Sequence, residues 1–233
     1  FPDLESLAKT DLSKVKLMWV SYPHMPTGSK PTKELFEQLV AFAKLHKIIL
    51  VNDNPYSFIL NENPLSILKI KGAKEVAMEL NSLSKTFNMA GWRVGMVLGS
   101  SKNIKCVLQV KSNMDSGMFY GIQKGAIAAL QSNPIWFKNL NKIYERRRVI
   151  AWKIAETLNC NYDSDSAGLF VWAKLPKGVE SEKMADMLLY TNNVFLAPGT
   201  IFGSNGEGYI RISLCVSEEV LQEVLDRFLI RDH

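Results

Sequence analysis

The chain of 233 residues has few cysteines and no long apolar run, and each absence excludes a class of protein. Its three cysteines, Cys106, Cys160 and Cys215, are far apart and match no zinc-binding or disulfide spacing. No apolar run approaches the ~20 residues that a membrane helix needs, and no secretory signal is visible at the start. His24 and His46 have no company at metal-ligand spacing. We therefore expect a reduced, cytoplasmic setting, no membrane partner and no metal site.

The composition is that of a globular protein with one large domain or two small ones. Hydrophobic residues make up 47% of the chain and charged residues 22%, which is ordinary for this class. The net charge of +5 is modest. Its main basic cluster, Arg146–Arg148, lies in a helical pattern without interleaved aromatic residues. We interpret it as a solvated helix face and expect no nucleic-acid partner.

The first 133 residues follow an α/β pattern. A helix opening at Pro31 and Thr32 has apolar residues at three, four and seven positions' spacing. Further helices are predicted over 102–113 and 120–131. Strands that alternate with helices require crossover connections, so we expect a mostly parallel sheet with flanking helices. The short apolar runs that predict its strands are Lys16–Tyr22, Ile48–Val51, Val76–Leu80 and Val94–Leu98.

A long helix is predicted over 134–158, and its length suits a connection between two domains. The pattern then changes to that of a small α+β domain over 159–233. Its last helix, Glu218–Leu229, has Ser217 as a candidate N-cap. The other expected elements are a strand over 169–175, a helix over 182–191, a short apolar run over 194–196 and a strand over 209–214.

Lys85 is the most informative residue in the chain. It lies among small hydroxyl residues directly after the apolar run 76–80, and Arg93 follows shortly after it. This combination suits a lysine that holds an aldehyde cofactor as an imine. Ser82, Ser84 and Arg93 could then bind a phosphate, because hydroxyls donate hydrogen bonds and a guanidinium binds two oxygens at once. Taken alone, each of these residues also fits an ordinary solvated loop.

Pyridoxal 5′-phosphate is an aldehyde cofactor that carries such a phosphate. It also needs an acid that keeps its pyridine nitrogen protonated. Asp53 ends a predicted buried strand, and Tyr56 follows at a distance that can reach the phenolic oxygen. Ligands of parallel sheets bind beyond the carboxyl ends of strands. Asp53, Lys85 and the turn 26–28 each follow a predicted strand and can therefore meet at one sheet edge. The alternative for 53–56 is a turn closed by an Asx hydrogen bond.

Arg211 stands in the middle of an apolar strand, between Ile210 and Ile212. A charged residue in such a strand needs a partner. The carboxylate of a substrate is one candidate, and a structural glutamate is the other.

Four segments together resemble the class I/II aminotransferases of PLP fold type I. They are Tyr22–Gly28, Asp53–Tyr56, Ser82–Lys85 with Gly91–Arg93, and Tyr209–Ser213. The resemblance covers essentially the whole chain, but only the C-terminal part of the family's usual length. It implies that 1–133 is the remainder of the large PLP-binding domain, 134–158 the connecting helix and 159–233 the small C-terminal domain.

The resemblance also implies a role for each site residue. Lys85 would form the Schiff base and shuttle the proton, Asp53 would pair with the pyridine nitrogen, and Tyr56 would bond the phenolic oxygen. The substrate's α-carboxylate would be bound by Arg211. The phosphate would be held by Ser82 and Arg93, with Ser84 as a further candidate.

The chain departs from the family pattern in two ways. Met25 stands where the family usually has an asparagine that bonds the phenolic oxygen, and Met25 cannot donate such a bond. The family's N-terminal region is also absent, and the chain opens with Phe1 rather than methionine. We therefore expect a fragment that alone binds the cofactor weakly and is inactive, from a protein that is a homodimer when intact.

The resemblance predicts an amino-acid:2-oxo-acid aminotransferase of amino-acid metabolism, in a biosynthetic process. The segment Asn88–Arg93 looks most like the prokaryotic branch of the family. A PLP-dependent C–S β-lyase could use the same site. An aminotransferase-like effector-binding domain of a transcription regulator is a third candidate. In such regulators a DNA-binding winged helix precedes the domain, and it would lie where the family's N-terminal region is absent here.

Overall fold

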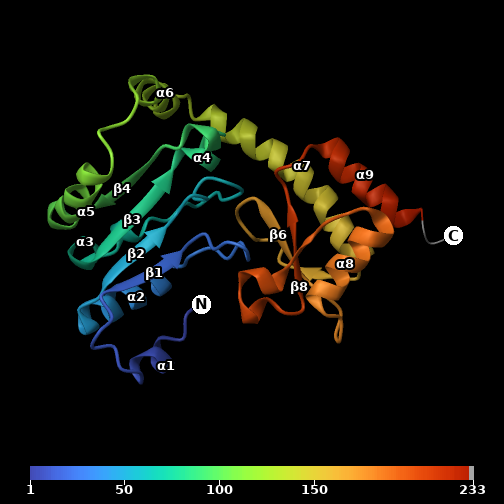
Figure 1. Cartoon of the computed structure of the whole chain (residues 1–233), viewed down its shortest axis with the longest axis horizontal. Helices are drawn as coiled ribbons and strands as arrows, with labels where there is room; N and C mark the ends of the chain where they lie inside the picture. The colour runs from blue at the N-terminus through green and yellow to red at the C-terminus, as the bar shows by residue number, and fades with distance from the viewer. Residues whose placement is uncertain (231–233) are drawn as a thin grey trace. The chain divides into compact units, whose positions relative to one another are not determined.

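A computed structural model of the chain describes residues 1–230 and divides it into two compact units (Figure 1). The first unit comprises Phe1–Pro23 and Lys30–Pro134. The second comprises His24–Ser29 and the chain from Ile135 onward. The short segment 24–29 therefore belongs to the second unit, although its neighbours in sequence belong to the first. The predicted α/β class is confirmed; the boundaries 133 and 158 and the role of each domain stay predictions.

The first unit is built on a four-stranded sheet (Figure 1). Its strands lie in the order β1 (Leu17–Ser21), β2 (Ile49–Asp53), β3 (Ala77–Ser82) and β4 (Gly95–Gly99). The first three are parallel, as predicted, whereas β4 is antiparallel to β3. The reason is the connection 83–94, which is too short for a crossover helix and returns the chain beside β3.

The helices of the first unit have different degrees of burial. They are α1 (Leu4–Ala8), α2 (Lys33–His46), α3 (Ala73–Val76), α4 (Leu83–Thr86), α5 (Ser101–Met114) and α6 (Tyr120–Leu130), with short 3₁₀ turns η1 (Ile67–Lys69) and η2 (Ala90–Trp92). The predicted apolar face of α2 is confirmed, because Leu35, Phe36 and Leu39 are buried in one cluster with Leu50 of β2 and Ala77 of β3. By contrast, α5 and α6 bury no residue fully in the described chain.

The second unit has an antiparallel sheet in the order β5-β6-β8-β7. Its elements are α7 (Ile135–Thr157), β5 (Asn161–Tyr162), β6 (Phe170–Lys174), α8 (Ser181–Asn192), β7 (Ala197–Pro198), η3 (Gly199–Phe202), η4 (Ser204–Gly206), β8 (Tyr209–Ser213) and α9 (Glu218–Leu229). The predicted N-cap of α9 is confirmed: Ser217 Oγ accepts a hydrogen bond from Val220 N at 3.4 Å. Among residues 1–230, α7 included, no helix is both long and apolar enough to cross a membrane.

The basic cluster on α7 differs from its prediction. Arg146 is exposed and pairs with Glu218, with 2.9 Å between Arg146 Nη2 and Glu218 Oε1. Arg147 and Arg148 are partly buried, and each donates from Nη1 to a backbone carbonyl: Arg147 to Leu214 at 3.0 Å and Arg148 to the carbonyl of residue 166 at 3.2 Å. The prediction of a solvated face is wrong for these two, because they bind α7 to the loops beside it.

A buried polar cluster joins the strands of the first sheet. Asn52 on β2 has no exposed surface, and its cross-strand partner Glu79 on β3 is only 3% exposed. Asn52 Nδ2 donates to Glu79 Oε2 at 3.2 Å, and Asn52 Oδ1 accepts from Tyr22 N at 3.1 Å. Glu79 Oε2 also accepts from Ile67 N at 3.0 Å. The cluster therefore connects β2, β3, the end of β1 and η1.

We predict that Asn52→Ala lowers the free energy of unfolding by about 2–3 kcal/mol, because it removes the buried amide that donates to Glu79 and accepts from Tyr22 N. Urea denaturation measures this loss. The matched control is Asn205→Ala at an exposed position of η4, for which we expect a change below about 0.5 kcal/mol. Equal effects of the two variants would contradict the importance of the cluster.

Candidate active site

The carboxyl ends of the three parallel strands lie at one edge of the first sheet. Ser21 at the end of β1 pairs with Asp53 at the end of β2, and Asp53 pairs with Leu80 of β3. Asn54 N continues this register by donating to Leu80 O at 2.9 Å. Asp53 and Ser82, which ends β3, therefore lie at the same edge. The turn 26–28 was predicted at this edge too, but it belongs to the second unit.

Asp53 is a half-buried carboxylate at this edge. Desolvation by burial raises the pKa of Asp53 above the ordinary aspartate value. No lysine, arginine or histidine in residues 1–230 forms an ion pair with it. Tyr56 follows in the same loop and is buried, with 8% of its surface exposed. A positively charged group placed at this edge would stabilise the ionised form of Asp53.

Lys85 lies on α4, in a loop that the sheet closes at both ends. Ser82 on β3 pairs with Gly95 on β4, and Leu83 N donates to Val94 O at 3.2 Å. The loop 83–94 therefore leaves and re-enters the sheet at the same place. Lys85 itself is partly buried.

Ser82 is the N-cap of α4, since its Oγ accepts from Ser84 N at 3.1 Å. The Ser82 hydroxyl proton remains able to donate to another group, because a hydroxyl is donor and acceptor at once. Arg93 stands at the far end of the loop in a left-handed conformation, with φ 54°. It is exposed, and its Nη1 donates to Ala90 O at 2.8 Å. One of its five N–H groups is used in this way.

A small apolar cluster supports the loop of Lys85. Leu83, Met89 and Val94 are all buried and pack with residues of α6, which are Ile122, Ala126 and Ala129. Gly95 follows directly, and an added Cβ there would lie 2.7 Å from Asn81 O. This apolar support is not among the features predicted from the sequence. The only sign of this cluster in the sequence is the presence of the apolar residues Leu83, Met89 and Val94 within one loop.

Arg211 on β8 belongs to the second unit and contacts side chains from three other segments of that unit. Its Cζ lies 4.0 Å from the ring centroid of Phe170 and 4.5 Å from that of Phe202. Its Nη1 donates to Met25 Sδ at 3.4 Å. The sequence does not reveal these contacts of Arg211, because no local pattern links Met25, Phe170 or Phe202 to one particular arginine.

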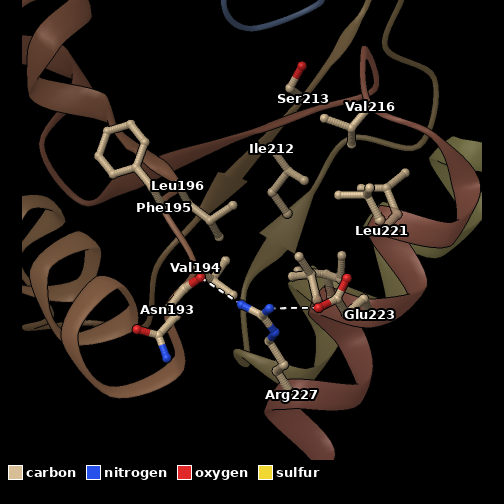
Figure 2. A pocket seen from close by; sticks show the side chains of 13 residues that line it. Asn193, Val194, Phe195, Leu196, Ile212, Ser213, Val216, Leu221, Glu223 and Arg227 are labelled. Carbon is tan, nitrogen blue, oxygen red and sulfur yellow. Dashed lines mark hydrogen bonds and ion pairs between the residues drawn. The ribbon is translucent and has the colours of Figure 1, made fainter.

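A separate cavity of about 250 Å³ lies in the second unit (Figure 2). Its walls are mainly apolar, with Phe195, Val216 and Leu221 among the lining residues. At its border Arg227 pairs with Glu223, 2.6 Å apart, and donates to Asn193 O at 2.8 Å. None of the site residues predicted from the sequence lines it. In residues 1–230 no group of three histidine, cysteine or acidic side chains could hold a metal ion.

Comparison with known proteins assigns the chain to a family. The family model "Aminotransferase class I and II" matches residues 1–228. LL-diaminopimelate aminotransferase 2 of Trichormus variabilis is 40% identical over 228 residues, which are 97% of this chain and 58% of that protein. LL-diaminopimelate aminotransferase of Maridesulfovibrio salexigens is 39% identical over 97% of this chain and 59% of its own length.

The solved structures agree. Apo-BacF from Bacillus subtilis is 37% identical, with a TM-score of 0.90 over 97% of this chain and 58% of that one. The chain thus spans somewhat more than half the length of the relatives that it matches, and corresponds to the C-terminal part of the PLP fold type I chain. The predicted family is confirmed: the chain belongs to the class I and II aminotransferases.

Proposed function

We propose that the protein containing this chain is a pyridoxal 5′-phosphate-dependent amino-acid:2-oxo-acid aminotransferase. One observation carries the proposal. In a member of this family, a half-buried carboxylate, Asp53, ends one parallel strand, and a lysine, Lys85, follows the next strand at the same sheet edge. Because the chain spans 58% of the length of its relative, the activity belongs to the full-length protein.

The electrostatics of Asp53 support this cofactor. Burial raises the pKa of Asp53, so ionising it costs free energy in the protein as it stands. A protonated pyridine nitrogen is a cation that would offset this cost. Asp53 therefore suits the ring nitrogen of pyridoxal phosphate, and Tyr56 in the same loop suits the phenolic oxygen.

The donor set after β3 suits the other end of the cofactor. Lys85 offers a primary amine, which can hold an aldehyde covalently. Ser82 keeps a hydroxyl proton to donate while its oxygen caps α4, and Ser84 offers a second hydroxyl. Arg93 brings the positive charge that a phosphate dianion needs, and its planar fork can bind two oxygens. The side chains of Lys85, Ser82, Ser84 and Arg93 therefore fit the aldehyde and the phosphate of pyridoxal phosphate.

Each residue then has a task in transamination. When bound, pyridoxal phosphate supplies an electron-accepting ring for the negative charge that develops at the substrate's Cα. Lys85 would hold the cofactor through its Nζ, and the same amine could then take up and return the proton of the substrate's Cα. Asp53 would pair with the ring nitrogen, and the positive charge of that nitrogen would favour the ionised carboxylate. Arg211 binds the substrate's α-carboxylate through its planar donors.

The relatives suggest which substrate to test first. Two of them are named LL-diaminopimelate aminotransferases, and this chain is about 40% identical to one of these. We therefore propose LL-diaminopimelate as the first amino-acid substrate to test. The family itself implies an amino acid and a 2-oxo acid as the two reactants.

We further propose that the intact protein is a cytoplasmic homodimer. Large apolar side chains of α5 and α6 and of the link between them are exposed, such as Met114 and Phe119 at 76% and Tyr120 at 65%. Exposed apolar area of this kind supports association with another surface. All three cysteines are free thiols, which suits a reduced compartment. Light scattering of the full-length protein tests the dimer.

The test of the function uses the full-length protein, pyridoxal phosphate and a panel of amino acids with 2-oxoglutarate or pyruvate as acceptor. We expect reduction with borohydride to attach the cofactor to the peptide that contains Lys85, as mass spectrometry measures. We expect Lys85→Ala to abolish this attachment and lower turnover by at least about 10³-fold. The matched control is Lys102→Ala, at an exposed position of α5, which should leave both unchanged.

Two results would overturn the proposal. Attachment of the cofactor to a lysine other than Lys85 would remove its chemical basis. Release of ammonia and pyruvate without a 2-oxo acid acceptor would make the protein a lyase instead. The same assay on residues 1–233 alone tests the expectation that this piece binds the cofactor weakly and is inactive.

We predict that Asp53 makes the stability of the cofactor-free protein depend on pH. Its raised pKa means that the native state binds a proton more tightly than the unfolded state does. The resulting stabilisation is complete below the unfolded pKa of about 3.9 and is lost as the pH rises through the folded value. Asn cannot ionise, so Asp53→Asn should gain stability relative to the parent between about pH 3 and pH 7.

Chemical denaturation over this pH range measures the difference. Asp186→Asn, at an exposed position of α8, controls for the loss of one negative charge. A difference that stays constant or falls with rising pH would contradict the burial argument. With pyridoxal phosphate added, Asp53→Asn should bind the cofactor more weakly than the parent, because the pyridinium then loses its partner.

A further inference from the structure

Met25 is the residue that the predicted roles leave unexplained, yet the structure joins it directly to Arg211. The two residues are 186 positions apart in sequence, and 3.4 Å separates Arg211 Nη1 from Met25 Sδ. The Phe170 and Phe202 rings pack against the same guanidinium, at 4.0 and 4.5 Å from its Cζ. Aromatic rings attract the cation and limit its movement toward or away from their faces. The bond to sulfur fixes a direction that the rings leave open, which is the orientation of Nη1.

The segment that carries Met25 is itself held rigidly. His24 N donates to Ser29 O at 2.9 Å, and Gly28 N donates to His24 O at 2.7 Å, so the segment 24–29 closes on itself. Gly28 O accepts from Ala167 N at 2.8 Å, which attaches the segment to the rest of the second unit.

Gly28 makes this attachment possible. It has φ +73°, and an added Cβ would lie 2.6 Å from the Cβ of residue 166 and 2.8 Å from Ala167 O. Only glycine fits such a close approach in this conformation without strain. Met25 thus presents its sulfur to Arg211 from a fixed backbone.

The chemistry of a thioether suits this position. Sulfur in methionine is a weak acceptor and carries no charge. A carboxylate at the same place would neutralise the guanidinium, whereas the thioether orients it and leaves its positive charge almost unchanged. The charge then remains available to attract an anionic ligand.

We propose that Met25 is a positioning residue that orients Arg211 and thereby sets the affinity of the protein for carboxylate substrates. The proposal rests on the proposed function, in which Arg211 binds the α-carboxylate of the substrate. Met25 acts through Arg211 and does not take part in the proton transfer. Its loss should therefore change substrate binding and leave the chemical step intact.

The test compares Met25→Leu with Met25→Gln in the full-length protein loaded with pyridoxal phosphate. Leucine conserves the volume but has no acceptor, whereas glutamine restores an acceptor. We expect Met25→Leu to raise the KM for both substrates about 3–10-fold, as the loss of one hydrogen bond predicts, with kcat within about twofold of the parent. Met25→Gln should recover most of this loss.

Binding of an unreactive carboxylate gives a measurement without turnover. Propionate has the carboxylate but neither an amine nor a keto group, so its inhibition constant and its calorimetric Kd report carboxylate binding alone. Both should rise with Met25→Leu by the same factor as the KM. Met184→Leu on α8, a partly buried methionine of the same unit, is the matched control and should change neither.

A double-mutant cycle with Arg211→Lys identifies the route of the effect. In the Arg211→Lys background, Met25→Leu should change the KM by less than about twofold. Unchanged KM and propionate binding in Met25→Leu would overturn the proposal. So would a fall in kcat at constant KM, or equal effects of Met25→Leu and Met184→Leu. Failure of the proposed function is a separate result, visible as missing attachment of the cofactor to Lys85.

Discussion

The hydrogen bond between Asn52 and Glu79 is the contact on which the arrangement of the candidate active site depends. It joins β2 and β3 near the ends of both strands, where Asp53 follows Asn52 directly and Ser82 lies three positions after Glu79. The same two side chains accept hydrogen bonds from the backbone amides of Tyr22 and Ile67. A buried carboxylate is tolerated only when donors satisfy it. A slip of one residue between the strands would break all these bonds at once and turn Asp53 to the other face of the sheet. The cluster therefore specifies the register as well as adding stability.

The strand register positions the two proposed site residues of the first unit in different ways. Asp53 follows Asn52 directly, so its position is set by the sheet itself. Lys85 lies in a loop, where the sheet alone would leave it loosely held. The antiparallel pairing of β4 with β3 closes that loop, and buried apolar residues of the loop pack against α6. An acid placed by the sheet and an amine in a supported loop suit the proposed site for pyridoxal phosphate.

Much of this could be predicted from the sequence, because the signals are local. The strands, the apolar face of α2 and the N-cap Ser217 follow from hydrophobic spacing and residue chemistry. Asp53 and Lys85 are candidates from the sequence because each follows a predicted strand. The features that could not be predicted from the sequence depend on contacts between distant segments. The antiparallel β4, the burial of Arg147 and Arg148 against loop carbonyls and the bond between Met25 and Arg211 all join segments that no local pattern relates.

We propose that Lys85 and Asp53 act on the same cofactor from neighbouring strand ends. The most direct measurement is an experimental structure of the full-length protein with pyridoxal phosphate. We expect continuous density between Lys85 Nζ and the cofactor, with the Asp53 carboxylate in hydrogen-bond contact with the ring nitrogen. A cofactor bound to another lysine, or a ring nitrogen facing a residue other than Asp53, would contradict it.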